Sequence, residues 1–213
     1  MHNPFLRVDD AVAYSSGITA AMAELIPTDY FAPLDLALAF PRPAPLEIDL
    51  GCGDGTLLAG LAEKFPQRNF LGIERLVGRV QSACGKVARA RLPNVRILRI
   101  ESTYAVKHLL PSSSIGVVHL LFPDPWPKKR HHRRRIVTGD FLAAVHRILV
   151  SGGTFRIATD QGDYFEAIRK LVFASAFQEE VGDKDETFPL TTFEKQFVAT
   201  RAPIYRLRLR KPA

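Results

Sequence analysis

Short apolar runs and segments with helical periodicity alternate along the chain from residue 46 onward. The apolar runs have the length and β-branched content of buried strands, and the longer segments repeat apolar residues every three to four positions, as helices do. The predicted strands are Leu46–Leu50, Asn69–Glu74, Val95–Ile100, Ile115–Leu121 and Thr154–Thr159, and the predicted helices are Thr56–Phe65, Leu76–Arg91, Tyr104–Leu110, Gly139–Leu149 and Tyr164–Ala174. This alternation predicts an α/β fold with a doubly wound, mostly parallel sheet and helices on both faces.

The N-terminal part of the chain does not follow this pattern. Residues 1–43 are predicted to be an irregular lead-in, with one short helical pattern at Ile18–Leu25 that ends before Pro27. Three prolines within Pro41–Pro45 indicate a linker into the main domain, residues 44–213.

The segment Ile204–Arg210 alternates with period two, which is typical of a strand with one buried face. Tyr205, Leu207 and Leu209 share one side, and three arginines share the other. We expect an antiparallel, half-buried C-terminal strand with a solvated arginine face.

Composition limits the class of protein. The chain has 213 residues, of which 46% are hydrophobic, and this suits one globular domain with a sizeable core. We find neither a signal-peptide pattern nor an apolar run of membrane-spanning length, and Cys52 and Cys84 are too few for a disulfide framework. No spacing of histidines and cysteines predicts a metal site. We therefore expect a cytoplasmic protein without a bound metal.

Positive charge is concentrated in one stretch directly after the strand Ile115–Leu121. Three prolines, Asp124 and Trp126, the only tryptophan of the chain, come first. The cations that follow contribute +6 to a net charge of +7, and they are Lys128, Lys129, Arg130, Arg133, Arg134 and Arg135. Because prolines restrict the backbone, Asp124 should be held in one place beside a docking site for polyphosphate.

Acidic residues follow the predicted strands. They are Asp49, Glu74, Glu101, Asp124 and Asp160. The carboxyl ends of parallel strands meet at one edge of a sheet, where ligands of such folds bind. Carboxylates repel one another, so they rarely cluster unless they bind a cation or accept hydrogen bonds from a ligand. The pattern therefore predicts a ligand that carries positive charge.

The glycine-rich loop after the first strand narrows the choice of ligand. Gly51, Gly53 and Gly55 let a ligand approach the backbone, but Thr56 stands where a dinucleotide fingerprint has its third glycine. Glu74 follows Asp49 by about 25 residues, the place of an acid that binds ribose hydroxyls. A ligand with a ribose, an adenine and a positive charge but no phosphates fits best, and S-adenosylmethionine is such a ligand.

These motifs also carry a family resemblance. Asp49–Gly55 resembles the first motif of the Rossmann-like methyltransferases. The combination of Phe122–Lys128, Arg133–Arg135, Ala158–Asp160 and Thr191–Glu194 is similar to the bacterial tRNA (guanine-N(7)-)-methyltransferase family. The resemblance implies a Rossmann-like fold and methyl transfer from S-adenosylmethionine to N7 of a variable-loop guanine, position 46 in tRNA numbering.

The resemblance also implies roles for individual residues. The S-adenosylmethionine site would be lined by Asp49, Gly51, Gly53, Glu74, Glu101 and Asp124. Asp124 would also be the catalytic residue. The tRNA guanine and its surroundings would be contacted by Lys128, Asp160, Thr191, Thr192, Phe193 and Glu194. The basic loop from Lys128 to Arg135 would bind the tRNA, and either a monomer or a homodimer is compatible with the sequence.

Two positions depart from the usual family pattern. The family commonly has Glu at the position of Asp49 and Asp at the position of Glu101, so the charge is kept and the reach changes by one methylene. Glu47 lies on the same strand face as Asp49 and is a candidate substitute for it.

Three alternatives stay open at this point. An amino-methyltransferase that acts on adenine or cytosine has a similar acid-proline-aromatic motif, but with two prolines where Asp124–Trp126 has one. A nicotinamide-dependent oxidoreductase is disfavoured by Thr56 and by the acids. A non-catalytic RNA-binding protein on the same scaffold is disfavoured because all five acids are present.

Overall fold

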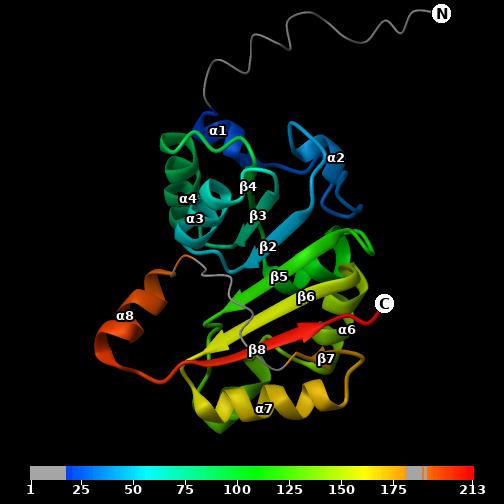
Figure 1. Cartoon of the computed structure of the whole chain (residues 1–213), viewed down its shortest axis with the longest axis vertical. Helices are drawn as coiled ribbons and strands as arrows, with labels where there is room; N and C mark the ends of the chain where they lie inside the picture. Colours follow the sequence, from blue (N-terminus) through cyan, green and yellow to red (C-terminus); the bar gives the residue numbers. More distant parts are fainter. Residues whose placement is uncertain (1–17, 181–188, 190) are drawn as a thin grey trace, which may run out of the picture.

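One mixed sheet dominates the computed structural model, which describes residues 18–180, 189 and 191–213 (Figure 1). Within these residues the sheet has eight strands in the order β1-β4-β3-β2-β5-β6-β8-β7. The strands are β1 (Glu24–Leu25), β2 (Leu46–Leu50), β3 (Asn69–Glu74), β4 (Val95–Arg99), β5 (Ile115–Leu121), β6 (Leu149–Thr159), β7 (Gln178–Glu179) and β8 (Tyr205–Arg210). The first six strands pair in parallel, whereas β8 pairs antiparallel with β6 and with β7.

Helices cover both faces of the sheet. They are α1 (Ala20–Ala23), α2 (Leu36–Ala39), α3 (Thr56–Lys64), α4 (Val77–Arg89), α5 (Ser102–Tyr104), the π-helix η2 (Ala105–Leu109), the 3-10 helix η3 (Lys129–Arg134), α6 (Gly139–Ile148), α7 (Gly162–Phe173) and α8 (Thr192–Thr200). Together with the strand pairing, this confirms the predicted doubly wound, mostly parallel fold with an antiparallel C-terminal strand.

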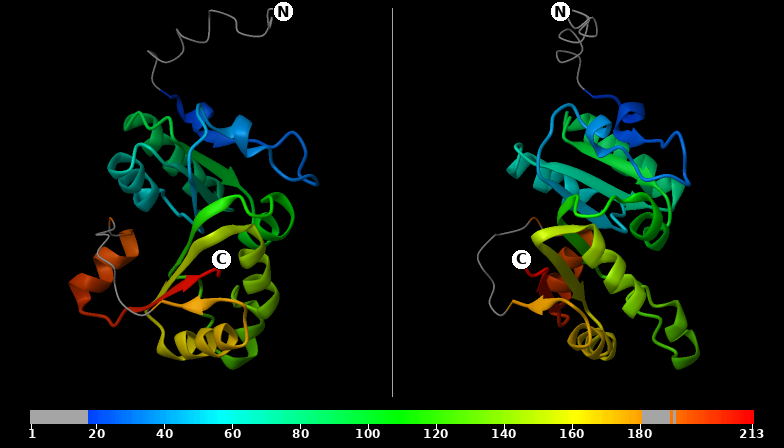
Figure 2. Two further views of the ribbon diagram at one scale, coloured as in Figure 1. Left: turned by 45° about the vertical axis from the view of Figure 1, so that its right-hand side comes forward. Right: turned by 90° about the vertical axis from the view of Figure 1, so that its right-hand side faces the viewer.

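The core has two parts, one on each face. Alternate residues of a strand point to opposite faces, so Phe70 belongs to the part of the core that includes buried residues of α1, α3 and α4, while Leu71 and Ile73 belong to the part that includes buried residues of η2, α6 and α7. Figure 2 shows α3 and α4 beside the strands at one end of the sheet, and α6 and α7 beside the strands at the other.

The predicted boundaries agree with the structure except where local irregularity intervenes. The strands Leu46–Leu50, Asn69–Glu74 and Ile115–Leu121 are observed as predicted, and the helices differ by one or two residues at most ends. β6 begins at Leu149 and not at Thr154, because the register shifts opposite Ile115 and Val117 and the strand continues through Gly152 and Gly153. Such a bulge interrupts the period-two alternation, so the sequence pattern does not predict the first part of the strand.

The predicted helix at Ile18–Leu25 is only partly correct. Helix α1 ends at Ala23, and Glu24–Leu25 form β1, which pairs with the otherwise open edge of β4. Residues 1–17 of the predicted lead-in lie outside the described residues. The sequence also missed α2, η3, β7 and α8, which are short or lack a strong apolar period.

The C-terminal strand β8 is half-buried, as its alternation predicts. Leu207 and Leu209 are buried. The opposite face is more than a solvated surface, because Arg206 pairs with Glu194 at 3.1 Å and Arg208 pairs with Glu180 at 2.7 Å. In the described part of the chain, no helix has the length and hydrophobicity to cross a membrane.

Candidate active site

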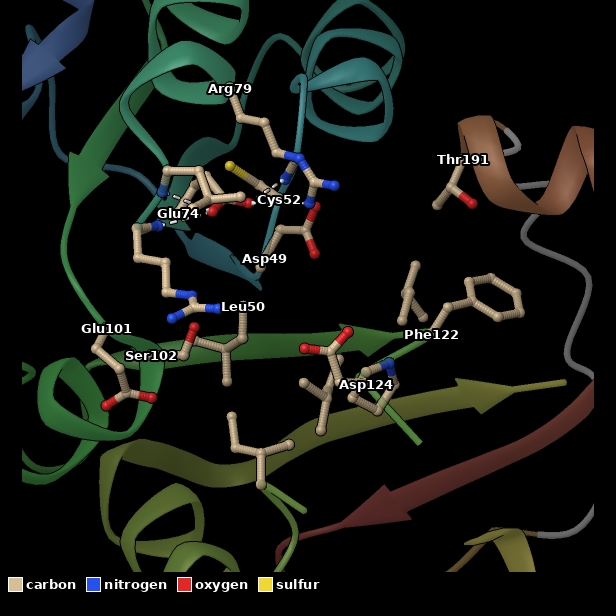
Figure 3. Close-up of a pocket in the computed structure, with 18 of the residues that line it drawn as sticks. Asp49, Leu50, Cys52, Glu74, Arg79, Glu101, Ser102, Phe122, Asp124 and Thr191 are labelled. Atoms are coloured by element: carbon tan, nitrogen blue, oxygen red, sulfur yellow. Dashed lines mark hydrogen bonds and ion pairs between the residues drawn. The ribbon is translucent and has the colours of Figure 1, made fainter. Parts of the chain in front are cut away.

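A pocket of about 680 Å³ opens where the strand order of the sheet reverses. β2 lies there between β3 and β5. The loops that follow β2 and β5 leave the carboxyl ends of these strands towards opposite faces of the sheet. The lining residues come from the loops that follow β2, β3, β4 and β5, with Thr191 added from the start of α8 (Figure 3). Open α/β sheets bind ligands at this switch point, and the volume suits a small organic cofactor.

The glycine loop after β2 presents bare backbone to the pocket. Gly51 and Gly53 have φ angles of 80° and 57°, and a Cβ atom at either position would meet nothing within 4 Å. Gly55 has φ 73° but serves packing, since a Cβ there would lie 2.9 Å from the Cβ of Ala83 in α4. The open space at Gly51 and Gly53 is what a ligand lying against the loop requires.

Asp49 is a buried acid at the base of this pocket. Its exposed fraction is 4%, and it lines the pocket from the end of β2. Burial raises the pKa of Asp49 to about 6, the charge of His119 opposes this shift, and Glu74 adds to it. A carboxylate that is costly to ionise in the free protein is stabilised when a cationic group enters the pocket. The site therefore fits the positively charged ligand that the sequence predicts.

Glu47 does not substitute for Asp49. Its carboxylate is 2% exposed and lies away from the described pocket lining, with Arg68 Nη1 at 2.6 Å and His119 Nε2 at 3.2 Å. Burial by itself would raise the pKa of Glu47, but hydrogen bonds and charge from His119 and Arg68 lower it below its usual value. Glu47 is thus a structural acid whose charge is neutralised within the core.

Glu74 connects the end of β3 to the glycine loop. Its Oε1 accepts hydrogen bonds from the backbone amides of Arg75 and Leu76, and Oε2 accepts one from Gly53 at 3.2 Å. The side chain is 4% exposed, so it is not the exposed helix cap that an isolated glutamate in this place would be. These bonds fix the carboxylate beside the pocket, where it can accept from ribose hydroxyls.

Glu101 and Asp124 complete the acidic lining. Glu101 is exposed and caps α5, because it accepts from the amides of Thr103 and Tyr104 at 2.9 and 2.8 Å. Asp124 is exposed and lines the pocket from the loop after β5, facing Asp49 across the same space (Figure 3). Four of the five predicted acids therefore meet in one pocket.

The loop around Asp124 has an unusual backbone. Phe122 and Trp126 adopt positive φ angles of 52° and 44°. Such conformations cost about 1–3 kcal/mol each and occur where neighbouring contacts fix them. The Phe122 ring packs on Phe197 of α8 at 5.0 Å, and Trp126 contacts the ring of His131 at 5.9 Å. The tryptophan thus packs against its own loop and also lines the pocket.

The basic run divides into two kinds of residue. Lys128, Lys129, Arg130, Arg133 and Arg134 are exposed on or beside η3, and Arg134 lies over the Trp126 ring at 4.9 Å. Arg135 is only 8% exposed, and it contacts Pro125 and Asp163 within the protein. The sequence groups these six cations together, but Arg135 is not accessible to a phosphate.

The residues expected to contact the nucleic acid are more scattered. Lys128 is exposed and Asp160 is half-buried, with its carboxylate bonded to Gln161 Nε2 at 2.7 Å, and neither belongs to the described lining. Thr191 lines the pocket. Thr191 and Glu194 form a capping box at the start of α8, in which each side chain accepts from the other's backbone amide. The side chains of Thr192 and Phe193 lie outside the described residues.

Sequence reasoning missed two arginines and a serine of the lining. Arg75, Arg79 and Ser102 belong to the pocket, and Arg79 Nη1 lies 3.8 Å from Glu74 Oε2. Arg75 and Ser102 directly follow the strand-end acids Glu74 and Glu101, which is the signal that could have identified them, whereas Arg79 lies in the first turn of α4. Cys52 also lines the pocket, and burial raises its thiol pKa well above the usual value, which agrees with the prediction of a packing residue.

Comparison with known proteins gives consistent results. A family model described as "Putative methyltransferase" matches residues 43–207. The tRNA (guanine-N(7)-)-methyltransferase of Sodalis glossinidius is 36% identical over 176 residues, which cover 79% of this chain and 74% of that protein. The protein of the same name from Geobacter metallireducens is 31% identical over 199 residues, which cover 89% of this chain and 92% of that protein.

Solved structures support the fold. The structure of an antibiotic-related methyltransferase superposes with a TM-score of 0.63 at 17% identity, covering 90% of this chain and 98% of that one. A SAM-dependent methyltransferase from Aquifex aeolicus gives 0.55 at 14% identity, covering 78% of this chain and 82% of that one. At these identities the likeness concerns the fold alone.

The buried carboxylate of Asp49 leads to a prediction about stability. Its pKa of about 6 lies above the ordinary 3.8, so the free energy of unfolding falls as the pH rises through this interval and the penalty is complete above it. Asp49→Asn should therefore raise the free energy of unfolding of the ligand-free protein by up to about 3 kcal/mol at pH 8, and by less as the pH falls towards 4. Denaturant unfolding at several pH values measures this.

Glu47→Gln is the matched control on the same strand. It leaves Arg68 and His119 facing a neutral amide, so it should lower the free energy of unfolding. If Asp49→Asn and the wild type have the same free energy of unfolding at pH 8, burial does not raise the pKa of Asp49. The Asp49 variant should also bind S-adenosylmethionine more weakly.

Proposed function

The chain belongs to the tRNA (guanine-N(7)-)-methyltransferase family, and we propose that it methylates N7 of a guanine in the variable loop of tRNA, position 46 in tRNA numbering. The observation that carries the proposal is a pocket that joins a buried acid with a raised pKa, Asp49, to the proline-stiffened loop of Asp124, with exposed cations immediately beside that loop. The names of the relatives favour this reaction over the alternatives drawn from the sequence.

In this proposal the cofactor site is formed by two glycines, Gly51 and Gly53, and by four acids, Asp49, Glu74, Glu101 and Asp124. S-adenosylmethionine supplies, when bound, a methyl group already activated by its sulfonium. Asp49 offers negative charge to the cationic end, and Gly51 and Gly53 allow the ligand close to the backbone. Glu74 accepts from the ribose hydroxyls, and Glu101 lies at the adenine side, one strand further along.

Guanine N7 needs no base to expose its lone pair, because it is an unprotonated acceptor. The task of the protein is then to place N7 in line with the methyl group. Asp124 and Asp160 would accept hydrogen bonds from the Watson–Crick edge, and these bonds strengthen as positive charge develops on the base. Asp124 is therefore an orienting and electrostatic residue and not a general base.

Residues at the border of the pocket and beyond it would contact the tRNA. The exposed cations of the basic loop would bind phosphates and position the substrate without reading its sequence. Lys128 and residues 191–194 would contact the surroundings of the target guanine, with Thr191 already at the pocket edge. Such a substrate implies action in the cytoplasm.

Methyl transfer to paired tRNA transcripts tests the function directly. The purified protein is incubated with methyl-labelled S-adenosylmethionine and two unmodified transcripts that differ only in G or A at the variable-loop position. We expect label in the G transcript alone, recovered as 7-methylguanine. Label in both transcripts would reject the assigned position, and label as an amino-methylated base would favour the amino-methyltransferase. Binding of tRNA without any label would favour the RNA-binding alternative.

Substitution of Asp124 tests the proposed orienting role. Asp124→Asn should lower kcat about 100-fold, since an amide provides weaker stabilisation of the developing charge, while the Kd for tRNA stays near its wild-type value. Glu63→Gln, which removes an exposed acid of α3 outside the described lining, should leave both quantities unchanged. Full turnover by the Asn variant would refute the role of Asp124.

Neutralising exposed cations tests the tRNA surface. The double substitution of Lys129 and Arg130 by Gln should weaken all tRNAs alike and reduce the salt dependence of binding by about one unit of slope per cation lost. The control removes the same charge from Arg169 and Lys170, which are exposed on α7. If both double variants show the same salt slope as the wild type, the basic loop does not contact the tRNA backbone.

A further inference from the structure

Arg135 ties the loop of Asp124 to helix α7 through three contacts. Its Nε donates to the carbonyl oxygen of Pro125 at 2.8 Å, one residue after Asp124. Its Nη2 pairs with Oδ2 of Asp163 at 2.7 Å, in the first turn of α7. Its guanidinium carbon lies 4.5 Å from the ring centroid of Tyr164. One side chain therefore joins two segments that are distant in the sequence.

The loop requires such a contact because its backbone is strained on both sides of Asp124. Phe122 and Trp126 have left-handed φ angles, which aromatic residues adopt only when surrounding interactions fix them. The prolines of the segment stiffen it without setting its orientation relative to the sheet. The hydrogen bond from Arg135 reaches Pro125, between the two strained positions.

The anchor of this contact is firm. Tyr164 is 1% exposed, and its hydroxyl oxygen accepts from the amide of Val137 at 3.3 Å. The hydrogen bond from Arg135 lowers the pKa of Asp163 below its usual value, as expected for a carboxylate that takes part in this ion pair. Arg135 itself is buried, unlike the exposed cations that precede it.

We propose that Arg135 is a positioning residue, which together with Asp163 and Tyr164 sets the place of the Asp124 carboxylate in the pocket. It thereby contributes to turnover and not to tRNA affinity, although it belongs to the same basic run. The inference rests on the proposed methyl transfer, in which Asp124 orients the guanine. Lysine cannot replace Arg135, because one ammonium group does not reproduce the planar fork that serves Pro125 and Asp163 together.

Kinetics of a double-mutant cycle test this role. Arg135→Lys should lower kcat about 10- to 100-fold, because a small displacement of the Asp124 carboxylate misaligns the guanine with the methyl group. The KM for tRNA and the salt dependence of binding should be unchanged. In the Asp124→Asn background the same substitution should cost little, because the carboxylate that Arg135 positions is already absent. Additive losses, or a raised KM with unchanged kcat, would overturn the inference.

Fluorescence of Trp126, the only tryptophan of the chain, tests the position of the loop without any turnover. Arg135→Lys and Arg135→Met should shift its emission to longer wavelength and increase its quenching by acrylamide. Arg147→Lys is the matched control, since Arg147 Nη2 donates to the carbonyl oxygens of Val106 and Leu110, away from the described pocket lining. It should lower the Tm and leave both the emission and kcat unchanged.

The two measurements separate the two proposals. If the wild-type protein methylates no tRNA, the proposed function fails, and the Trp126 emission still decides whether Arg135 holds the loop. If the Arg135 variants fold with unchanged Trp126 emission and quenching, the inference is overturned whatever the methylation assay gives.

Discussion

Parallel hydrogen bonding of β2 to both β3 and β5 is the constraint on which the pocket depends. It places the carboxyl ends of three strands at one edge of the sheet. The chain leaves β2 towards the face covered by α3 and α4, and it leaves β5 towards the face covered by α6 and α7. The connections separate above the strand ends, and side chains from both loops turn into the space between them.

Two acids of β2 show how environment divides roles within one strand. Glu47 is enclosed with Arg68 and His119, so its charge is balanced inside the protein. Asp49, two residues later on the same face, is nearly as buried but borders the pocket and has a raised pKa. An ion pair balances the charge of Glu47 without a ligand, whereas the costly charge of Asp49 at the pocket favours binding of a cation. Burial alone does not distinguish these cases, but the neighbouring charges do.

The sequence predicts the sheet, most helices and four pocket acids, because periodicity and strand-end positions are local signals. It does not reveal that Arg135 differs from Arg134, since adjacent arginines look alike until Asp163 and Tyr164 are brought near by α7. For the same reason the sequence alone does not show which of the two acids of β2, Glu47 or Asp49, lines the pocket. β1 and β7 were missed because a two-residue strand has no period, and its existence depends on the open edge of a partner.

The insertion of β8 between β6 and β7 has a consequence for how the chain is made. Thr154–Thr159 expose a row of backbone donors and acceptors until residues 205–210 arrive to pair with them. During synthesis this edge is completed only after α7 and the segment bearing α8 have emerged, so an unfinished chain presents an open strand that invites pairing with another nascent copy. The arginines alternating along β8 keep the late strand soluble before it docks.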